Sequence, residues 1–335
     1  MSDTPVAKRP RMDEVQPAQD QAMDSQPEYQ RGDIWFEDGN VVLIAQDTTF
    51  RVHRGVLSNK SDVFSGMFSV PQPENMEMLD GCPAVHLSDS KDNLTHMLLA
   101  LYNGDRYFDL TVPLPFHAVS AMLQLGSKYQ IDELKRAAVH RLQRHIPSHL
   151  EDFVGPYRTL PSRGDPLISD FVDEHAIAVI DLAWRHELHA LLPPAFYACA
   201  QLRSKALAEG FTDPAGVHWK LSRKDLWRCL EGQRSLRTQL MFRMQFLWDK
   251  EVSPTCAQSS WCKERLVLER GRTVTIQLSA TVYRALEDSG WIETLQLCKP
   301  CTDHFVWMHD GIRQDSWRRL ARMFQMKDIV TWPVE

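Results

Sequence analysis

Four cysteines in the last third of the chain have the residue type and the spacing of a metal site. Cys298 and Cys301 form a C-x-x-C pair, and Cys256 and Cys262 lie upstream with five residues between them. A C-x-x-C turn directs two thiolates toward one ion, and a second cysteine pair can complete a tetrahedral Zn²⁺ shell. These four cysteines are therefore candidate ligands of a structural Zn²⁺, with His304 as the substitute ligand.

Two other interpretations of these cysteines stay open. The spacing of the first pair is wider than the two to four residues usual in zinc sites, so unrelated buried cysteines are one alternative. A C-x-x-C is also a redox motif, but that interpretation needs a βαβ context, which this part of the sequence lacks. If Zn²⁺ is bound, all four positions are filled by protein, and the site is structural rather than catalytic.

The sequence contains near matches to two enzyme motifs, but neither match is complete. His186-Glu187-Leu188-His189 has one residue between the glutamate and the second histidine, whereas a zincin motif needs two. His149-Leu150-Glu151 matches half of a zinc deaminase motif, but Cys298 lies far downstream and is not preceded by proline. The glycine motifs that hold phosphates or form nucleophile elbows are absent from the sequence. We therefore predict a protein that is not an enzyme and has no cofactor besides the Zn²⁺.

The hydrophobic pattern of residues 32–146 predicts an α+β domain. Residues 41–45 are nearly all apolar, which is typical of a strand buried on both faces, and residues 49–53 alternate as a half-buried strand does. Together they predict a hairpin. A helical stripe over residues 55–68, with Ser61-Asp62 as a cap, a short strand over residues 84–87 and helical stripes over 94–102, 118–129 and 131–142 complete the domain.

Several separated positions in this domain resemble the signature of the BTB/POZ family. Phe50-Arg51-Val52-His53-Arg54 is followed by Leu57, Ser61, Phe64 and Met67-Phe68, and Tyr102-Asn103-Gly104-Asp105 resembles the family's helix end. The segment from Trp35 to Asn40 is similar to the version abundant in fungal BTB proteins. The resemblance covers residues 32–146 and implies a hairpin and short strands with a helical cluster, followed here by a mainly α-helical C-terminal region.

The resemblance also implies protein partners. It is that of a protein–protein adaptor or scaffold, which binds itself or a partner, and one version is a substrate receptor for a cullin-type ubiquitin ligase. Many family members have an aspartate at the position of Asn40, which forms a charged pocket with the basic residue equivalent to Arg54; here Asn40 is neutral. From the residues alone, we expect a neutral His53 that donates to a backbone carbonyl. The implied partner-binding residues are Asn40, His53, Arg54, Met67, Phe68, Tyr102 and Asp105.

The second half of the chain has a mainly helical pattern. We predict a helical extension over residues 147–240 and a C-terminal helical region over residues 241–335. A helical stripe runs from residue 168 to residue 192, where Pro193-Pro194 is expected to end it, and residues 196–207 form another helix.

Residues 201–250 hold ten basic and five acidic residues with tryptophans and phenylalanines among them. One interpretation is a nucleic-acid surface with stacking platforms. The other is a packed helix pair, which the stripe of Leu236, Leu240, Met244 and Leu247 favours. The alternative function is therefore a nuclear regulator of transcription or chromatin, which binds nucleic acid or chromatin proteins through residues 201–335. Nucleic acid is the less favoured partner.

Composition places the chain among ordinary globular proteins. Its 335 residues carry a formal charge of −6, and the pI near 6.1 is no signature of a polyanion binder. No apolar run approaches the length that crosses a bilayer, so no membrane association is expected. Residues 1–31 are expected to be disordered, and their basic cluster of Lys8, Arg9 and Arg11 is either a nuclear localisation signal or a chance triplet. We expect the nucleus, the cytoplasm or both.

Overall fold

The computed structural model describes residues 29–71, 76–152, 167–249, 251–279, 284–286 and 288–333. The predicted disordered tail, with the basic cluster of Lys8, Arg9 and Arg11, lies outside these residues. Within the described residues, every helix is too short or too polar to pass through a lipid bilayer.

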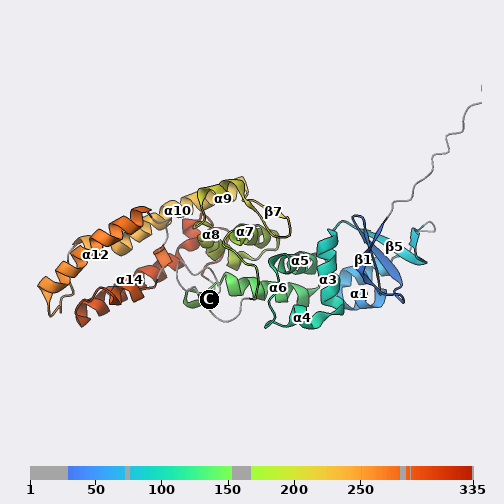
Figure 1. The fold of residues 1–335 in the computed structure, drawn as a ribbon, viewed down its shortest axis with the longest axis horizontal. Helices are drawn as coiled ribbons and strands as arrows, with labels where there is room; N and C mark the ends of the chain where they lie inside the picture. Colours follow the sequence, from blue (N-terminus) through green and yellow to red (C-terminus); the bar gives the residue numbers. More distant parts are fainter. Residues whose placement is uncertain are drawn as a thin grey trace, which may run out of the picture.

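A five-stranded sheet forms one end of the molecule (Figure 1). The strand order is β1-β3-β2-β5-β4, and the strands are β1 (Gln30–Trp35), β2 (Val41–Ala45), β3 (Thr48–Val52), β4 (Met78–Leu79) and β5 (Cys82–Leu87). The predicted hairpin is confirmed, because β2 pairs antiparallel to β3 with Val41 opposite Val52. Strand β2 lies in the centre of the sheet and pairs parallel to β5, so all five of its residues are buried as the apolar run predicts.

Six helices pack beside this sheet: α1 (Arg54–Lys60), α2 (Asp62–Ser69), α3 (Lys91–Tyr102), α4 (Gly104–Phe108), α5 (Phe116–Lys128) and α6 (Asp132–His145). The stripe over residues 55–68 is two helices rather than one, because Ser61 has an extended backbone between them. Its Oγ accepts the Phe64 N–H at 3.1 Å and caps α2, as predicted. Ser90 caps α3 in the same way, and α3 ends at Asn103.

The segment after the undescribed residues 153–166 does not continue as a helix, although residues 168–192 are predicted to form one. Leu114 donates its N–H to the Leu167 carbonyl at 3.1 Å and accepts the Ser169 N–H at 2.9 Å. Asp170 then accepts the Phe116 N–H at 2.6 Å, which caps the start of α5. Residues 167–170 therefore pair with the loop before α5, and helix α7 begins only at His175 (His175–Arg185).

The tandem prolines start a helix instead of ending one. After a short 3₁₀ turn (η2, His189–Leu191), α8 runs from Leu192 to Cys199 with Pro193 and Pro194 in its first turn. Proline fits there because the first turn of a helix needs no N–H donors. The single helix predicted over residues 196–207 is divided in the structure, because α8 ends at Cys199 and a separate helix, α9 (Ser204–Glu209), follows. A small hairpin of β6 (Phe211–Thr212) and β7 (His218–Trp219) comes next.

Three longer helices extend away from the sheet (Figure 1). They are α10 (Arg223–Met244), α12 (Ser259–Ser279) and α14 (Lys299–Arg318), with the short elements η1 (Leu150–Asp152), α11 (Phe246–Asp249), η3 (Arg284–Leu286), α13 (Gly290–Glu293) and α15 (Leu320–Met323) completing the described fold. The division into regions at residue 240 stays a prediction, and α10 continues across it.

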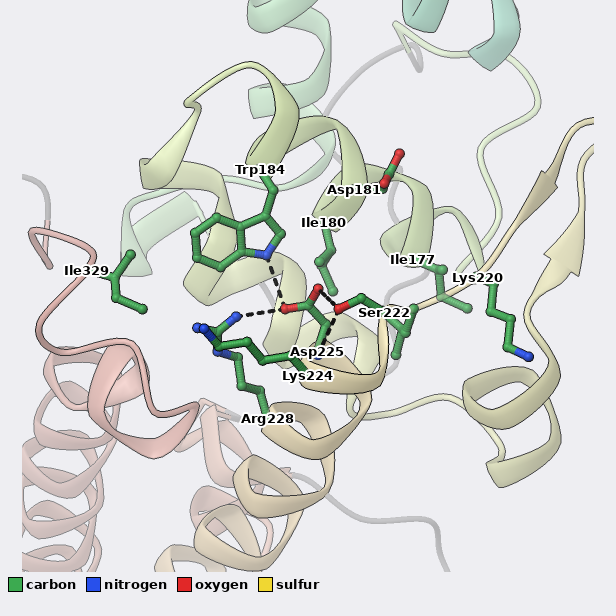
Figure 2. A pocket seen from close by; sticks show the side chains of 11 residues that line it. Ile177, Ile180, Asp181, Trp184, Lys220, Ser222, Lys224, Asp225, Arg228 and Ile329 are labelled. Carbon is green, nitrogen blue, oxygen red and sulfur yellow. Dashed lines mark hydrogen bonds and ion pairs between the residues drawn. The ribbon is translucent and has the colours of Figure 1, made fainter.

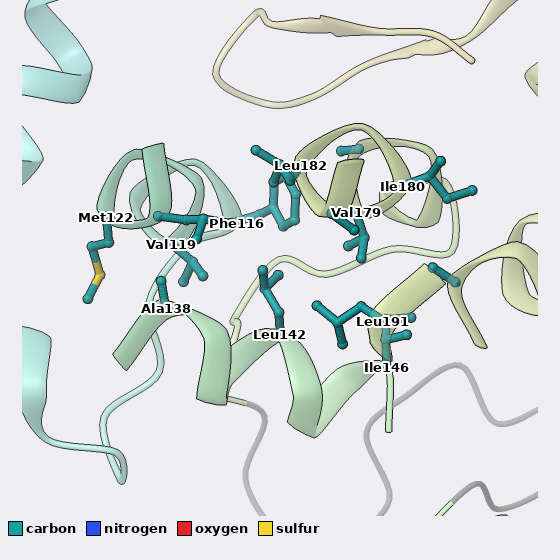
Figure 3. Close-up of a cluster of buried hydrophobic side chains, with 14 of the residues drawn as sticks. Phe116, Val119, Met122, Ala138, Leu142, Ile146, Val179, Ile180, Leu182 and Leu191 are labelled. Carbon is teal, nitrogen blue, oxygen red and sulfur yellow. The ribbon is translucent and has the colours of Figure 1, made fainter. Parts of the chain in front are cut away.

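One hydrophobic core joins the sheet domain to the helical region. It includes buried residues from Ile34 in β1 to Val330 near the end of the described chain. Figure 3 shows Leu142 and Ile146 facing Val179 and Leu191, so side chains from α6 pack directly against α7 and the η2 turn. A second, smaller core of nine buried residues lies apart and holds Met244, Phe246 and Phe305. The fold is thus an α+β domain followed by a mainly helical region, as predicted.

Candidate metal centre and interaction surface

The four predicted ligand cysteines meet in the structure. The Sγ atoms of Cys256, Cys262, Cys298 and Cys301 all lie within 4.8 Å of one another. The Cys256 and Cys298 sulfurs are 3.6 Å apart, far beyond the roughly 2.05 Å of a disulfide. A tetrahedral ion with Zn–S bonds of about 2.3 Å would hold its sulfurs about 3.8 Å apart. The sulfur spacing therefore fits a tetrahedral metal centre, and the four-sulfur donor set suits Zn²⁺.

Two helix starts position three of the four sulfurs. Cys298 is the N-cap residue of α14, and Cys301 lies in the first turn of that helix. Cys262 lies in the first turn of α12, and its Sγ accepts the Cys298 N–H at 3.3 Å. Cys256 comes from the loop between α11 and α12, where its N–H bonds the Ser253 carbonyl at 2.9 Å. Helix N-termini stabilise thiolates, so this placement favours metal binding.

The thiols of this cluster differ in their pKa values. At Cys298 burial alone would raise the pKa, but N–H donors from Cys301 and Ala257 and the neighbouring thiols outweigh it, and the pKa falls to about 6. Burial raises the pKa of the Cys262 and Cys301 thiols. A divalent cation would offset the cost of burying these thiolates, because it stabilises several negative charges at one point.

The second hydrophobic core surrounds the cysteine cluster. Cys262 and Cys301 are fully buried in it, beside Leu266, Ile292 and Phe305. Nine buried residues are a small core, and small cores commonly need a metal or a disulfide for stability. In the described part of the chain all seven cysteines are free, so no disulfide supplies this support.

The two histidines near the C-x-x-C pair do not join the cluster. His304, the predicted substitute ligand, lies beside Phe305 with ring centroids 5.3 Å apart. His309 is fully buried, and its Nδ1 lies 2.7 Å from the Arg243 guanidinium, which places it between α10 and α14. Burial and the nearby Arg243 charge lower the pKa of His309 to about 3, so the ring is neutral.

Four of the seven residues implied as partner-binding form a connected group where β2 begins and β3 ends, next to the end of α3. The Tyr102 Oη accepts the His53 N–H at 2.8 Å and lies 3.2 Å from its Nδ1. The Asn40 side chain accepts the Arg54 N–H at 2.8 Å. His53 therefore contacts a tyrosine hydroxyl, and its Nε2 lies 3.2 Å from Asp38, so the expected bond to a backbone carbonyl is wrong.

Of the three remaining implied residues, Phe68 contacts this group directly through Arg54. The Arg54 guanidinium donates to the Phe68 carbonyl at 2.7 Å and lies over the Phe68 ring. Met67 is half-buried beside Phe68 at the end of α2, and Asp105 is exposed in the first turn of α4. We call the group of Asn40, His53, Arg54, Met67, Phe68, Tyr102 and Asp105 the hairpin surface. Its charge comes from Arg54 and Asp105, because Asn40 is neutral and Asp38 faces His53.

Two further residues belong to this surface, although the implied partner-binding set does not include them. Asp38 is exposed and lies beside His53, and the Phe36 ring stacks on Tyr102 with centroids 4.5 Å apart. Both residues belong to the run from Trp35 to Asn40, which contributes to the family resemblance but does not indicate which of its side chains lie at the surface.

The family model of the BTB/POZ domain matches residues 36–146. Together with the sheet and the helices α1 to α6, this match shows that residues 36–146 form a BTB/POZ domain. Comparison with curated proteins gives no match. BTB/POZ domains are generally interaction modules, so the domain indicates protein partners and supports a protein–protein interaction adaptor in general.

Proposed function

We propose that this chain is a non-enzymatic adaptor that holds two protein partners on one continuous frame. The observation that carries the proposal is the shared core, because residues of the BTB/POZ domain and of the helical region pack in one hydrophobic cluster. A partner on the hairpin surface is then held in a fixed relation to a partner on the helical region. An adaptor needs this property, because its role is to hold its partners in a defined arrangement.

For the BTB/POZ domain, the proposed partner is a subunit of a cullin-type ubiquitin ligase, with a second copy of this chain as the other candidate. The hairpin surface contains partly exposed apolar side chains at the end of α2 and an exposed charged residue at the start of α4, which is a suitable mixture for a protein interface. Met67, Phe68 and Val70 supply the apolar part, and Val70 is 60% exposed. Asp105 supplies an exposed carboxylate.

A binding assay with purified proteins tests this proposal. The full chain is mixed with a purified cullin–ring-finger complex, and the mass of the product is measured by light scattering after gel filtration. Asp105→Arg should weaken the complex about tenfold or more, because it reverses a charge at the interface. Asp80→Arg is the matched control, since Asp80 is exposed in the turn between β4 and β5. A dimer of the chain without any cullin complex would overturn the ligase proposal and leave self-association.

For the helical region, we propose that the cysteine cluster holds one structural Zn²⁺. The sulfur spacing, the two helix N-termini and the small surrounding core support this proposal. The ion would supply folding free energy to the end of the helical region that lies apart from the main core. It would have no catalytic role, because all four positions are filled by cysteine sulfur.

A second candidate function is a nuclear regulator that binds nucleic acid through residues 201–335. One observation favours it: Trp227, 51% exposed, lies on the face of α10 that also carries the exposed Arg223, Arg234 and Arg237. Against it, Arg234 pairs with Glu231 at 2.9 Å, and the predicted stripe residues Leu236, Met244 and Leu247 are buried. Fluorescence anisotropy with labelled single-stranded RNA at increasing salt separates the two functions, because nucleic-acid binding falls steeply with salt.

A further inference from the structure

A cleft lies on the helical region, between α7, the start of α10 and the segment around Ile329. Its volume is about 510 Å³, within the range of roughly 300–1,000 Å³ that is usual for ligand sites. Figure 2 shows Trp184 and Ile329 at one end of the cleft and Ile177 and Lys220 at the other. Helix α7 and the start of α10, which line the cleft, lie apart from the five-stranded sheet (Figure 1), and no residue of the hairpin surface lines the cleft.

The cleft is positively charged in a protein whose net charge is −6. Lys220 and Lys224 line it, and among the described residues neither ammonium has a carboxylate within ion-pair distance. Asp181 also lines the cleft, but the Arg185 guanidinium lies 2.9 Å from its carboxylate. The two lysine charges are therefore the uncompensated ones.

The second carboxylate of the cleft, Asp225, is held by its own neighbours. It accepts from the Arg228 guanidinium at 2.9 Å, from the Trp184 indole N–H at 3.2 Å and from the Ser222 hydroxyl at 2.5 Å. Its side chain and that of Arg228 are only 10% and 4% exposed. Asp225 therefore fixes Arg228 and Trp184 in the wall of the cleft and does not offer a free negative charge that would repel an anion.

Apolar side chains form the floor between the two lysines. Ile177, Ile180 and Leu221 line it and belong to buried helix and loop positions, and Trp184 adds an indole ring. Ile329 closes one side of the cleft and is 43% exposed, so it offers apolar surface to an occupant. An occupant that covers Ile329 and places negative charge near Lys220 and Lys224 complements both the shape and the charge of the cleft.

We propose that this cleft binds a short acidic segment of a partner protein, in which one large apolar residue lies between two carboxylates. The apolar side chain would cover Ile180 and Ile329, and the carboxylates would pair with Lys224 at one end and Lys220 at the other. This inference rests on the proposed adaptor function, for which it names the chemistry of the second partner.

A selection experiment tests the inference with the intact chain. Random heptapeptides displayed on phage are selected against the full-length protein, and the enriched peptides are synthesised and titrated by fluorescence anisotropy. We expect sequences in which Asp or Glu flanks Leu, Ile, Phe or Met. Lys224→Glu should weaken these peptides at least about fivefold, because it replaces attraction with repulsion. The new glutamate lies in the first turn of α10, where a negative charge is favourable, so the helix should still fold.

Arg223→Glu is the matched control, since Arg223 is the exposed neighbour of Lys224 and does not line the cleft. It should leave the affinity of the selected peptides within about twofold of the wild type. Three results would overturn the inference: enrichment of basic or uncharged peptides, equal loss of binding in both variants, or displacement of the peptides by single-stranded RNA. If the acidic peptides do not bind but the chain still forms its complex with the cullin or with a second copy of itself, the cleft inference is rejected and the adaptor proposal stands. Peptide binding without any complex on the hairpin surface would reject the adaptor and keep the cleft.

Discussion

At the scale of single residues, two buried histidines accept backbone N–H bonds close to where the BTB/POZ domain meets the helical region, and the bond of His145 links the two regions. His145 Nε2 accepts the Ile168 N–H at 3.0 Å, and His175 Nδ1 accepts the Val172 N–H at 2.9 Å. Burial lowers both pKa values, and Arg144 and His175 lower that of His145 further, to about 4. A protonated ring nitrogen cannot accept these bonds, so acid should weaken this joint.

The sign of the pH dependence follows from the pKa of His145. The pKa of a histidine is ordinarily 6.5, and that of His145 in the folded chain is about 4. Between these two pH values the unfolded state therefore binds more protons than the folded state. The contribution of His145 to stability is therefore fully present above about pH 6.5 and is lost as the pH falls toward 4. When the pH falls from 7 to 5, proton binding to His145 in the unfolded state should lower the free energy of unfolding by about 2 kcal/mol. Urea unfolding of the wild type and of His145→Gln measures this, and equal pH slopes in both proteins would contradict it.

Phe64 tests the packing of the sheet domain at the same scale. It is fully buried, and its ring stacks on Tyr129 with centroids 4.4 Å apart. Phe64→Ala should therefore cost about 3–5 kcal/mol of unfolding free energy. Ser65→Ala is the control because Ser65 is exposed on the same helix, and it should change stability by less than about 0.5 kcal/mol. Similar denaturant midpoints for the two variants would mean that the Phe64 side chain is not in the core.

At the scale of elements, the cysteine cluster links the starts of α12 and α14. A chelator should remove one Zn²⁺ per chain and lower the melting temperature, because metal binding supplies folding free energy. Cys298→Ser with Cys301→Ser should melt at the temperature of the chelated wild type and respond no further to chelator. Cys82→Ser is the control, since Cys82 is a buried cysteine in β5, outside the cluster. Wild-type protein that holds no Zn²⁺ and melts unchanged in chelator would contradict the structural metal.

Much of the element order could be predicted from the sequence because local signals and packing agree. Ser61 and Ser90 are caps with the expected hydrogen bonds, and the apolar run of β2 is buried as predicted. The prediction was wrong at residues 168–174, where the Leu114 backbone competes with the helix for hydrogen bonds. It was also wrong at Pro193, because a proline signal can end a helix or start one, and only tertiary context decides.

The candidate site was predicted unevenly for a related reason. The C-x-x-C spacing is local, and it identified Cys298 and Cys301; their meeting with Cys256 and Cys262 depends on two helix starts that the sequence does not place together. The cleft at Lys220 and Lys224 had no sequence signal, since its walls come from α7, α10 and the chain near Ile329.

At the scale of the whole molecule, the central claim is that one chain holds two separate partner surfaces. The most direct test is affinity capture of the tagged full chain from a nuclease-treated native lysate, quantified by mass spectrometry for the wild type, Asp105→Arg and Lys224→Glu. The account predicts two sets of captured proteins, one lost only in Asp105→Arg and the other only in Lys224→Glu. Captured proteins that are retained equally by both variants, or lost together in both, would contradict it.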